Sequence, residues 1–368
     1  MLSLTTPLNW QRVRLGDIFF ITAGGDLSKP HYSNTKQSDF NYPIYSNAIE
    51  KKGLCGYSSF FIIKNKSITI TARGTIGVAF FRDYPYVPIG RLLVLQPKIS
   101  NIDCRFYAEY INSKVKFNTE QTTIPQLTIP KVALCEIPLP PLNEQIAIAN
   151  ILSDLDRYLC ALRALILKKE GVKKALSFEL LSQRKRLKGF NQAWQRVRLG
   201  DICEITTGSL DANEMVHYGK YRFYTCAKEY YFIDKYAFDT EAILISGNGA
   251  HVGYVHYYKG KFNAYQRTYV LDNFSEHIIF VKYFLTMFLQ SHIQTNRNEG
   301  NTPYIVMATL KDFEILLPPL NEQIAIANIL SDLDNEIISL KNKKRQFENI
   351  KKALNHDLMS AKIRVLEK

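Results

Sequence analysis

The chain has 368 residues, which is long for one compact core and suits two domains with connecting segments. Its 46% hydrophobic and 22% charged residues are typical of a globular protein and exclude the disordered and collagen-like classes. The formal net charge of +13 favours a nucleic acid as partner, because neutralised phosphates release their counterions. An acidic protein partner or simple solubility are the alternatives.

Targeting signals and metal-binding patterns are missing from the sequence. No apolar run is long enough to span a bilayer, and the opening MLSLTTPLNW lacks the basic and apolar regions of a signal peptide. We therefore expect a cytoplasmic protein without membrane contact. The six cysteines are widely spaced and form no CxxC pair, so neither a zinc site nor a disulfide framework is indicated. We expect no cofactor and no metal.

The chain is one unit written twice. WQRVRLGDI at Trp10–Ile18 returns at Trp194–Ile202. LPPLNEQIAIANILSDLD at Leu139–Asp156 returns at Leu317–Asp334 with every residue identical, and a shorter KKAL repeat follows each copy at the same spacing. Two copies are too few for a solenoid, so we expect a pseudo-twofold internal repeat that presents the same surface twice.

The variable stretch inside each copy has the pattern of a mixed α/β domain. SITITARGTIGVAFF at Ser67–Phe81 alternates β-branched and aromatic residues around a glycine turn, which predicts strand, turn and strand. AILISGNGAHVGYVHYY at Ala242–Tyr258 has the same outline. Helical patterns follow at Phe106–Lys114 and Phe280–Phe288. We expect the two domains to share a fold and to differ in their loops.

Each PPLNEQ sequence begins a long helix. Pro140–Pro141 cannot lie inside a helix, Asn143 is a favoured N-cap residue, and Glu144 suits the helix dipole in the first turn. Apolar residues then recur at alternating steps of four and three, which is a heptad pattern, although it weakens around Gly171 in the first copy. Each helix could run for about 45 residues, or roughly 65–70 Å.

These patterns together predict an α/β fold class. We expect two similar mixed α/β domains, each followed by a long helix, with the two helices packing as an antiparallel coiled coil. The predicted boundaries place the first domain at residues 1–139 and the first long helix at 140–190. The second domain then covers 191–317 and the second long helix 318–368.

No catalytic motif occurs in the sequence. It contains no GxxxxGK[ST] loop, no HExxH, no GxSxG and no Pro-Pro-aromatic loop of the amino-methyltransferases. His251 and His256 lie five residues apart, but no further ligand pattern accompanies them, so we read them as structural or surface residues. We expect a protein without an active site of its own. A nuclease site scattered over Asp, Glu and Lys residues is an alternative that no motif supports.

Matched turns of the two domains carry the first candidates for DNA contact. Arg73 and Thr75 lie at the predicted strand turn of the first domain, where an arginine could bind a guanine edge or a phosphate. Asn248 and His251 occupy the corresponding turn of the second domain. The simpler alternative is that Arg73 only solvates a hairpin.

Further polar candidates lie elsewhere in both domains. Arg91 and Arg267 correspond to one another and could contact phosphates or form structural pairs. The polar stretches TEQTTIPQLT and RNEGNTPYIV precede the long helices and suit either DNA contact or turns. The remaining DNA-binding candidates are Asn47 and six residues of these stretches, Thr122, Thr123, Gln126, Asn301, Thr302 and Tyr304.

Basic clusters at Arg184–Lys188, Lys341–Arg345 and Lys351–Lys352 fall on the predicted long helices. They fit a solvated helix face, or contact along a DNA backbone or an acidic partner.

This architecture resembles the specificity (S) subunit of type I restriction–modification systems. The resemblance covers essentially the whole chain and depends on the repeated PLPPLNEQIAIANILSDLD and WQRVRLGDI and on the glycine turns at Gly74–Gly77 and Gly249–Gly253. It implies that each domain is a target recognition domain that reads one half of a bipartite double-stranded DNA target. The helices would set the gap between the halves.

The resemblance also implies partners. Two methyltransferase (modification) subunits would dock on the repeated helix starts, and restriction subunits would join that complex, leaving this chain non-catalytic. The candidate partner-binding residues are Asn143, Glu144, Gln145, Asn321, Glu322 and Gln323. A helical protein-binding scaffold without specific DNA readout is the alternative.

Overall fold

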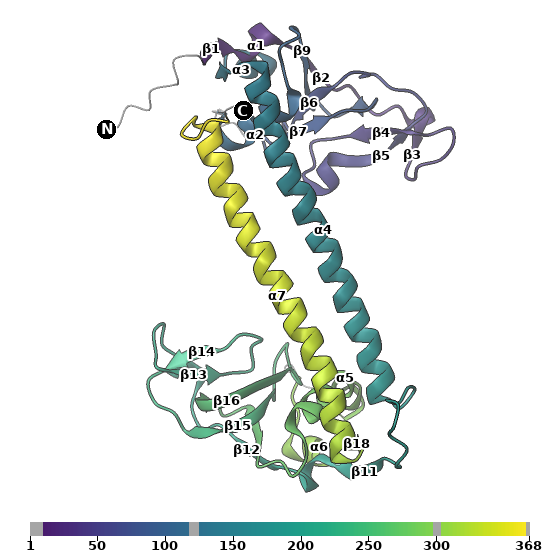
Figure 1. Cartoon of the computed structure of the whole chain (residues 1–368), viewed down its shortest axis with the longest axis vertical. Helices are drawn as coiled ribbons and strands as arrows, with labels where there is room; N and C mark the ends of the chain where they lie inside the picture. Colours follow the sequence, from purple (N-terminus) through teal and green to yellow (C-terminus); the bar gives the residue numbers. More distant parts are fainter. Residues whose placement is uncertain (1–9, 118–124, 297–302, 366–368) are drawn as a thin grey trace. The chain divides into compact units, whose positions relative to one another are not determined.

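The structure is a computed structural model and describes residues 10–117, 125–296 and 303–365 (Figure 1). It divides into two compact units, one formed by Met1–Arg163 with Lys343–Lys368 and the other by Ala164–Asn342. Each unit therefore contains one variable domain, the start of one long helix and the end of the other. The predicted four-segment boundaries stay a prediction, because each long helix contributes to both units.

The first unit contains short sheets and short helices around the start of the first long helix. One four-stranded sheet has the order β2-β9-β6-β7, another has the order β3-β5-β4-β8, and β1 pairs with β10. Its strands are β1 (Gln11–Arg14), β2 (Phe19–Ala23), β3 (Tyr32–Ser33), β4 (Tyr42–Tyr45), β5 (Leu54–Ser58), β6 (Ser67–Ile70), β7 (Ala79–Arg82), β8 (Val87–Pro88), β9 (Leu93–Pro97) and β10 (Glu136–Leu139). Its helices are α1 (Leu15–Ile18), α2 (Cys104–Lys114) and α3 (Ile129–Ala133), with 3-10 turns at Lys29–His31 and Glu50–Gly53.

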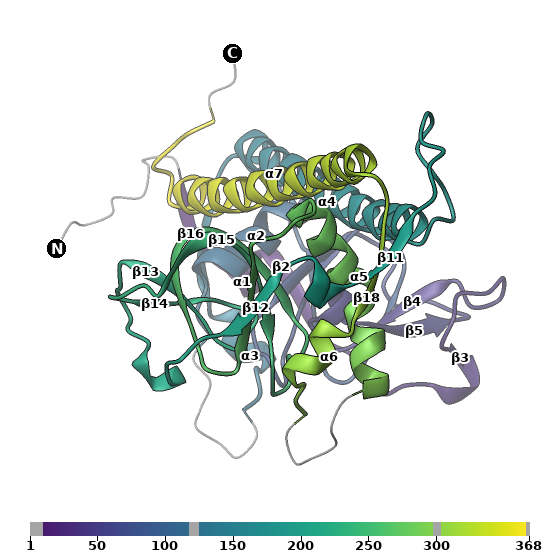
Figure 2. The same cartoon turned by 90° about the horizontal axis from the view of Figure 1, so that it is seen from below.

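The second unit repeats this plan with one larger sheet. Six strands have the order β12-β17-β15-β16-β13-β14, and β11 pairs with β18. The strands are β11 (Gln195–Arg198), β12 (Glu204–Thr207), β13 (Tyr221–Tyr224), β14 (Tyr231–Ile233), β15 (Phe238–Ser246), β16 (Val255–Ala264), β17 (Thr268–Asp272) and β18 (Glu314–Leu317). The helices are α5 (Ile278–Asn296) and α6 (Met307–Lys311), with 3-10 turns at Leu199–Asp201 and Ala212–Glu214. Figure 2 shows α5, α6 and β18 close together, and residues of all three share one core cluster with the start of α7.

The predicted strand–turn–strand pairs are confirmed in both domains. β6 and β7 are antiparallel, as are β15 and β16. In the second domain β16 also continues into the parallel pairing with β13, whereas in the first domain the separate strand β8 makes the parallel pairing with β4. One long strand in place of two short ones is what joins the second domain into a single sheet.

The repeated WQRVRLGDI sequence forms the same strand pair twice. Gln11 lies opposite Leu139, and Gln195 lies opposite Leu317. Each copy of the opening signature therefore pairs with the strand that leads directly into the adjacent proline pair, so the two exact repeats contact one another within each unit.

The two long helices are α4 (Leu142–Leu181) and α7 (Leu320–Met359), each of 40 residues. α4 runs without interruption through Gly171. The predicted N-cap was wrong by two positions, because the helix already begins at Leu142 and the amides of Glu144 and Gln145 donate to the carbonyl of Pro141. The Asn143 side chain accepts from the amide of Glu144 instead.

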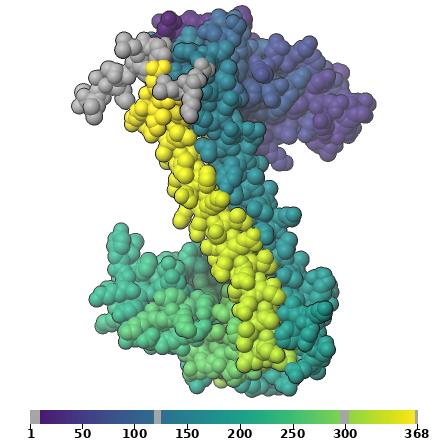
Figure 3. Space-filling model, in the orientation of Figure 1, coloured from purple at the N-terminus to yellow at the C-terminus, as the bar shows by residue number. Residues whose placement is uncertain are grey.

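The helices pack antiparallel within each unit, as predicted. In the first unit the Tyr158 and Phe347 rings lie 4.7 Å apart and Lys351 pairs with Asp156 at 2.7 Å. In the space-filling view the side chains of α7 lie directly against those of α4 (Figure 3). The predicted heptad positions of α7 are all buried or half-buried, namely 326, 330, 333, 337, 340, 344, 347, 351, 354 and 358. The heptad interpretation is therefore confirmed.

Ion pairs continue the seam where its apolar pattern weakens. Lys169 pairs with Glu336 at 2.8 Å and Lys173 with Asp334 at 2.5 Å, both within the second unit. Their long apolar stems cover the seam while their ammonium groups reach the carboxylates of α7. A seam that looks broken in sequence is thus continuous in structure.

Each core includes residues from both long helices. In the first unit Ile148 of α4 and Leu358 of α7 pack with Phe106 of α2. In the second unit Leu181 of α4 and Ile326 of α7 join the corresponding cluster. None of the helices in the described ranges is both long and apolar enough to cross a membrane.

Replacing Gly171 with alanine should stabilise the protein. Gly171 lies in a helix interior, and a Cβ there would meet no atom within 4 Å. Gly171→Ala should raise the free energy of unfolding by about 1 kcal/mol, measured by urea titration. Gly77→Ala is the control of opposite sign, because Gly77 has a φ of +88° and its Cβ would lie 2.9 Å from the Phe117 ring. Equal effects of the two changes would contradict the helical conformation at Gly171.

Candidate nucleic-acid interface and the helix starts

Four chain segments meet at the tip of the first domain and form what we call the first loop cluster, residues 46–48, 72–75, 90–91 and 125–127. The Asn47 side chain joins three of them, because its Oδ1 accepts from the Ala72 amide at 2.7 Å and its Nδ2 donates to the Gly90 carbonyl at 2.6 Å. The Leu127 amide donates to the Ala72 carbonyl at 2.9 Å. The structure therefore brings together candidates that are far apart in sequence.

The predicted contact residues of this cluster differ in exposure. Arg73, Thr75, Arg91 and Gln126 are exposed, whereas Asn47 is half-buried and has both ends of its amide bonded to the backbone. Arg73 Nη2 donates to Gln126 Oε1 at 3.4 Å. The exposed side chains are accessible to a ligand, whereas the Asn47 amide is already bonded within the cluster. The candidates Thr122 and Thr123 lie outside the described residues.

The second loop cluster comprises residues 225–228, 247–253, 266–267 and 303–305, and it repeats the backbone bond between the strand turn and the stretch before the long helix. The Gly247 amide donates to the Arg267 carbonyl at 2.8 Å, and the Ile305 amide donates to the Gly247 carbonyl at 2.9 Å. Asn248 is half-buried and forms an isolated antiparallel bridge with Tyr304. Arg267 and Tyr304 are exposed. Asn301 and Thr302 lie outside the part of the chain that the structure describes.

His251 lines a cavity of about 360 Å³ beside this cluster. Lys228, Tyr254 and Gln290 also line it, and Gln290 Nε2 donates to the Val252 carbonyl at 2.8 Å. Lys228 and Gln290 are not among the site residues predicted from the sequence. The available signal for Lys228 was its position directly after YTCA, which corresponds to the YSNA that contains Asn47.

His256 has a structural role next to the same cavity. Its Nε2 lies 2.9 Å from the Ala227 carbonyl, so that nitrogen carries the proton and donates. Burial is the largest influence on the pKa of His256 and lowers it. A neutral imidazole that anchors the β13–β14 turn fits the structural reading of this residue.

The first helix start holds a buried carboxylate with two partners. Glu144 is 5% exposed, and its Oε2 accepts from Trp10 Nε1 at 3.0 Å. Arg364, from the segment after α7, reaches the same carboxylate at 3.3 Å. The opening signature, the helix start and the end of the other helix therefore meet at one side chain.

The second helix start repeats this arrangement. Glu322 is fully buried, its Oε2 accepts from Trp194 Nε1 at 3.2 Å, and Arg186 pairs with it at 2.6 Å. Arg186 follows the end of α4, so the predicted placement of the Arg184–Lys188 cluster on the long helix was wrong. At least one member of that cluster serves an internal ion pair.

The adjacent glutamines connect each start of a long helix to the N-terminus of a shorter helix that precedes it in the chain. Gln145 Nε2 donates to the Pro140 carbonyl at 2.9 Å, and Gln145 Oε1 accepts from the Asp103 amide at the N-cap of α2. Gln323 makes the corresponding bonds to the Pro318 carbonyl and to the amide of His277, which precedes α5.

Four of the six predicted docking residues are buried. Glu144, Gln145, Glu322 and Gln323 are buried and bonded within the chain, so their side chains are not available to a partner in this structure. The two remaining candidates, Asn143 and Asn321, are exposed. Docking at the helix starts stays a prediction.

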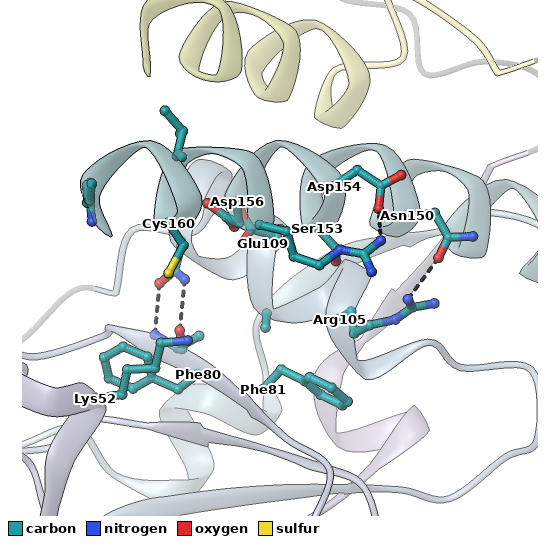
Figure 4. Close-up of a pocket in the computed structure, with 16 residues that line it drawn as sticks. Lys52, Phe80, Phe81, Arg105, Glu109, Asn150, Ser153, Asp154, Asp156 and Cys160 are labelled. Atoms are coloured by element: carbon teal, nitrogen blue, oxygen red, sulfur yellow. Dashed lines mark hydrogen bonds and ion pairs between the residues drawn. The ribbon is translucent and has the colours of Figure 1, made fainter. Parts of the chain in front are cut away.

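A larger cavity of about 750 Å³ lies in the first unit between β7, α2 and α4 (Figure 4). The Asn112 amide bonds both the N–H and the C=O of Ala79 at 2.8 Å, which satisfies part of the free edge of β7. Arg105 donates to Asn150 at 2.8 Å, and Arg157 pairs with Asp154. Arg105, Glu109, Asp156 and Arg163 of this lining pair with charged residues outside it. The lining carries charges of both signs, so the cavity offers no single sign of charge to a ligand.

Comparisons with known proteins agree on one family. A family model described as the type I restriction modification DNA specificity domain matches residues 7–169 and 191–349. The type I restriction enzyme EcoDI specificity subunit of Escherichia coli is 38% identical over 170 residues, which are 45% of this chain and 37% of that protein. The type I restriction enzyme MjaVIII specificity subunit of Methanocaldococcus jannaschii is 24% identical over 418 residues, covering 99% of this chain and 95% of that protein.

The fold is also found among solved structures. The crystal structure of the type I restriction-modification system S subunit from M. genitalium has a TM-score of 0.73 at 19% identity, covering 97% of this chain and 98% of that one. The chain spans less than half the length of the first curated relatives that it matches, between 36% and 44%.

Removing Arg186 should strongly destabilise the protein. Arg186→Ala leaves the Glu322 carboxylate buried with a single remaining partner, Trp194, which should cost about 3–5 kcal/mol in the free energy of unfolding. The control is Arg196→Ala, because Arg196 and its partner Glu314 have side chains that are 66% and 54% exposed. That change should cost less than about 1 kcal/mol. Urea unfolding compares the two, and equal losses would contradict the buried anchor.

Proposed function

We propose, since this chain belongs to the family of type I restriction modification DNA specificity domains, that it recognises a bipartite double-stranded DNA sequence as a non-catalytic subunit. One observation carries the proposal. The two loop clusters share the backbone bond between the strand turn and the stretch before the long helix, but they present different side chains at matched positions. One fold that recognises two different half-sites requires a shared backbone with different exposed side chains.

The matched tips support separate half-site recognition. Arg73 in the first cluster corresponds to Asn248 in the second, and both follow a residue whose carbonyl accepts from the stretch before the long helix. Arginine and asparagine suit different bases, guanine and adenine respectively. The net charge of +13 supplies the attraction to phosphates that is independent of sequence.

The long helices suit a spacer between the half-sites. α4 and α7 each run for 40 residues, and each contributes to the core of both units. In the proposed function the gap between the two DNA words follows from the length of this helix pair. The sequence of each half-site follows from the side chains of one loop cluster.

The repeated helix starts suit the docking of two modification subunits. Buried residues of the exact repeat are explained by the fold, but a solvent-facing stripe on each helix is also identical. The stripes comprise Asn143, Ile146, Asn150 and Asp154 on α4, and Asn321, Ile324, Asn328 and Asp332 on α7. Two equal contact surfaces would hold two copies of one partner. Restriction subunits would join the complex through these partners.

Exchanging one domain should change one half of the recognised sequence. Residues 18–136 are replaced with the corresponding segment of another specificity subunit, and the chain is produced together with its modification subunits. Mapping of methylated bases in genomic DNA should show one new half-site, the other half-site unchanged and the same gap. Loss of sequence selectivity in both halves, or methylation that never depended on this chain, would argue against the proposal and for a scaffold role.

A charge placed in either docking stripe should weaken one partner contact. Ile146 is 37% exposed and Ile324 is 39% exposed, so aspartate at either position is tolerated by the fold but must be desolvated on docking. Each single variant should bind one modification subunit at least about tenfold more weakly, and the double variant should bind neither well. Native mass spectrometry and titration measure this. Ile338→Asp, an exposed α7 position outside the stripes, is the control.

A further inference from the structure

We infer that Arg73 selects a guanine in the half-site read by the first domain, with Gln126 and Asn47 as its positioning residues. This inference rests on the proposed function and assigns a base to one of its two reading sites. It depends on how the first loop cluster fixes the arginine, and on how the second cluster differs.

The backbone that carries Arg73 is held from two sides. Its neighbour Ala72 donates its N–H to Asn47 and accepts at its carbonyl from Leu127, at 2.7 and 2.9 Å. Gly74, with a φ of +68°, turns the chain directly afterwards. Arg73 therefore projects into solvent from a loop whose backbone is already fixed, which reduces the ordering cost of binding.

One edge of the Arg73 guanidinium contacts a neighbouring side chain. Gln126 Oε1 accepts from Arg73 Nη2 at 3.4 Å, and both side chains are exposed. One contact with Gln126 leaves other N–H donors of the planar guanidinium for a ligand. Two parallel N–H donors match the O6 and N7 acceptors of guanine in the major groove. A phosphate contact would not need this orientation, because phosphates accept from many directions.

Asn47 also holds the loop that carries a second arginine, Arg91. Its Nδ2 donates to Gly90, the residue before Arg91, and the Arg91 amide donates to the Gly24 carbonyl at 3.0 Å. One side-chain amide thus lies between the residues that precede Arg73 and Arg91. It acts as a spacer between the loops that carry the two cations.

In the second cluster the two loops bond directly. Cys226 takes the place of Asn47 and its Sγ donates to the Arg267 carbonyl at 3.3 Å, and the Gly247 amide donates to the same carbonyl at 2.8 Å. A Cβ at Gly247 would lie 2.3 Å from that carbonyl oxygen, so the direct bond requires glycine. The first domain, with Ala72 and an inserted amide, holds its two loops differently. Asn248 takes the position of Arg73 in the described part of the second cluster, so the guanine selection is assigned to the first domain.

The test uses the chain in complex with its modification subunits and a duplex that carries the mapped target. Each guanine of the half-site is replaced in turn by 7-deazaguanine, which lacks the N7 acceptor. One replacement should weaken binding by the wild-type complex about 10- to 100-fold. Arg73→Ala should weaken binding to the normal target by a similar factor and should no longer distinguish the two duplexes.

The positioning residues need a readout that a loss of folding would not mimic. Gln126→Ala and Asn47→Asp should reduce the discrimination at the same guanine about tenfold, while discrimination in the other half-site stays unchanged. Asn47→Asp keeps the acceptor for Ala72 but loses the donor to Gly90. Arg12→Ala, an exposed arginine on β1, is the control and should change neither half-site.

Three results would overturn the inference. Arg73→Ala could still distinguish guanine from 7-deazaguanine at every position, or it could weaken binding to all duplexes equally, as loss of a phosphate contact does. The positioning variants could alter both half-sites equally. Failure of the proposed function gives a different result, since the wild-type complex would then bind its mapped target no better than an unrelated duplex.

Discussion

A buried glutamate at the start of each long helix is the constraint on which the rest of the structure depends. An ionised carboxylate in a core is costly unless it is paired and hydrogen-bonded. Glu144 and Glu322 meet that requirement with an indole N–H from the opening signature and a guanidinium from the segment after the other helix. Three distant segments must therefore converge before either carboxylate is satisfied, which explains why the glutamate, the tryptophan and the arginine recur in both halves.

With the helix starts fixed, the variable domains are free to change at their tips. Each loop cluster contains a backbone bond that does not depend on the exposed side chains, from the Leu127 amide to the Ala72 carbonyl in the first and from the Ile305 amide to the Gly247 carbonyl in the second. Replacing Arg73 or Asn248 leaves those bonds in place. The molecule thus separates the residues that hold the fold from the residues that select DNA in the proposed function.

The repeats, the strand pairs and the long antiparallel helices were predictable, because they depend on local periodicity and on comparison of the two copies. The burial of Glu144 was not predictable, since a charged residue in a helix start is usually exposed and its partner Trp10 lies far away in sequence. The role of Asn47 was missed for the same reason: a polar residue after a strand looks available to a ligand until Ala72 and Gly90 are seen beside it.

The composition of the first unit has a consequence for biosynthesis. That unit combines Met1–Arg163 with Lys343–Lys368, whereas the second is a continuous stretch of chain. The second unit can complete its core as soon as it leaves the ribosome. The first must wait for roughly 200 further residues, about 10–40 s at usual elongation rates, before Leu358 and Arg364 arrive. During that interval Glu144 lacks its arginine partner, Arg364. The first unit is therefore synthesised first but finishes folding after the second.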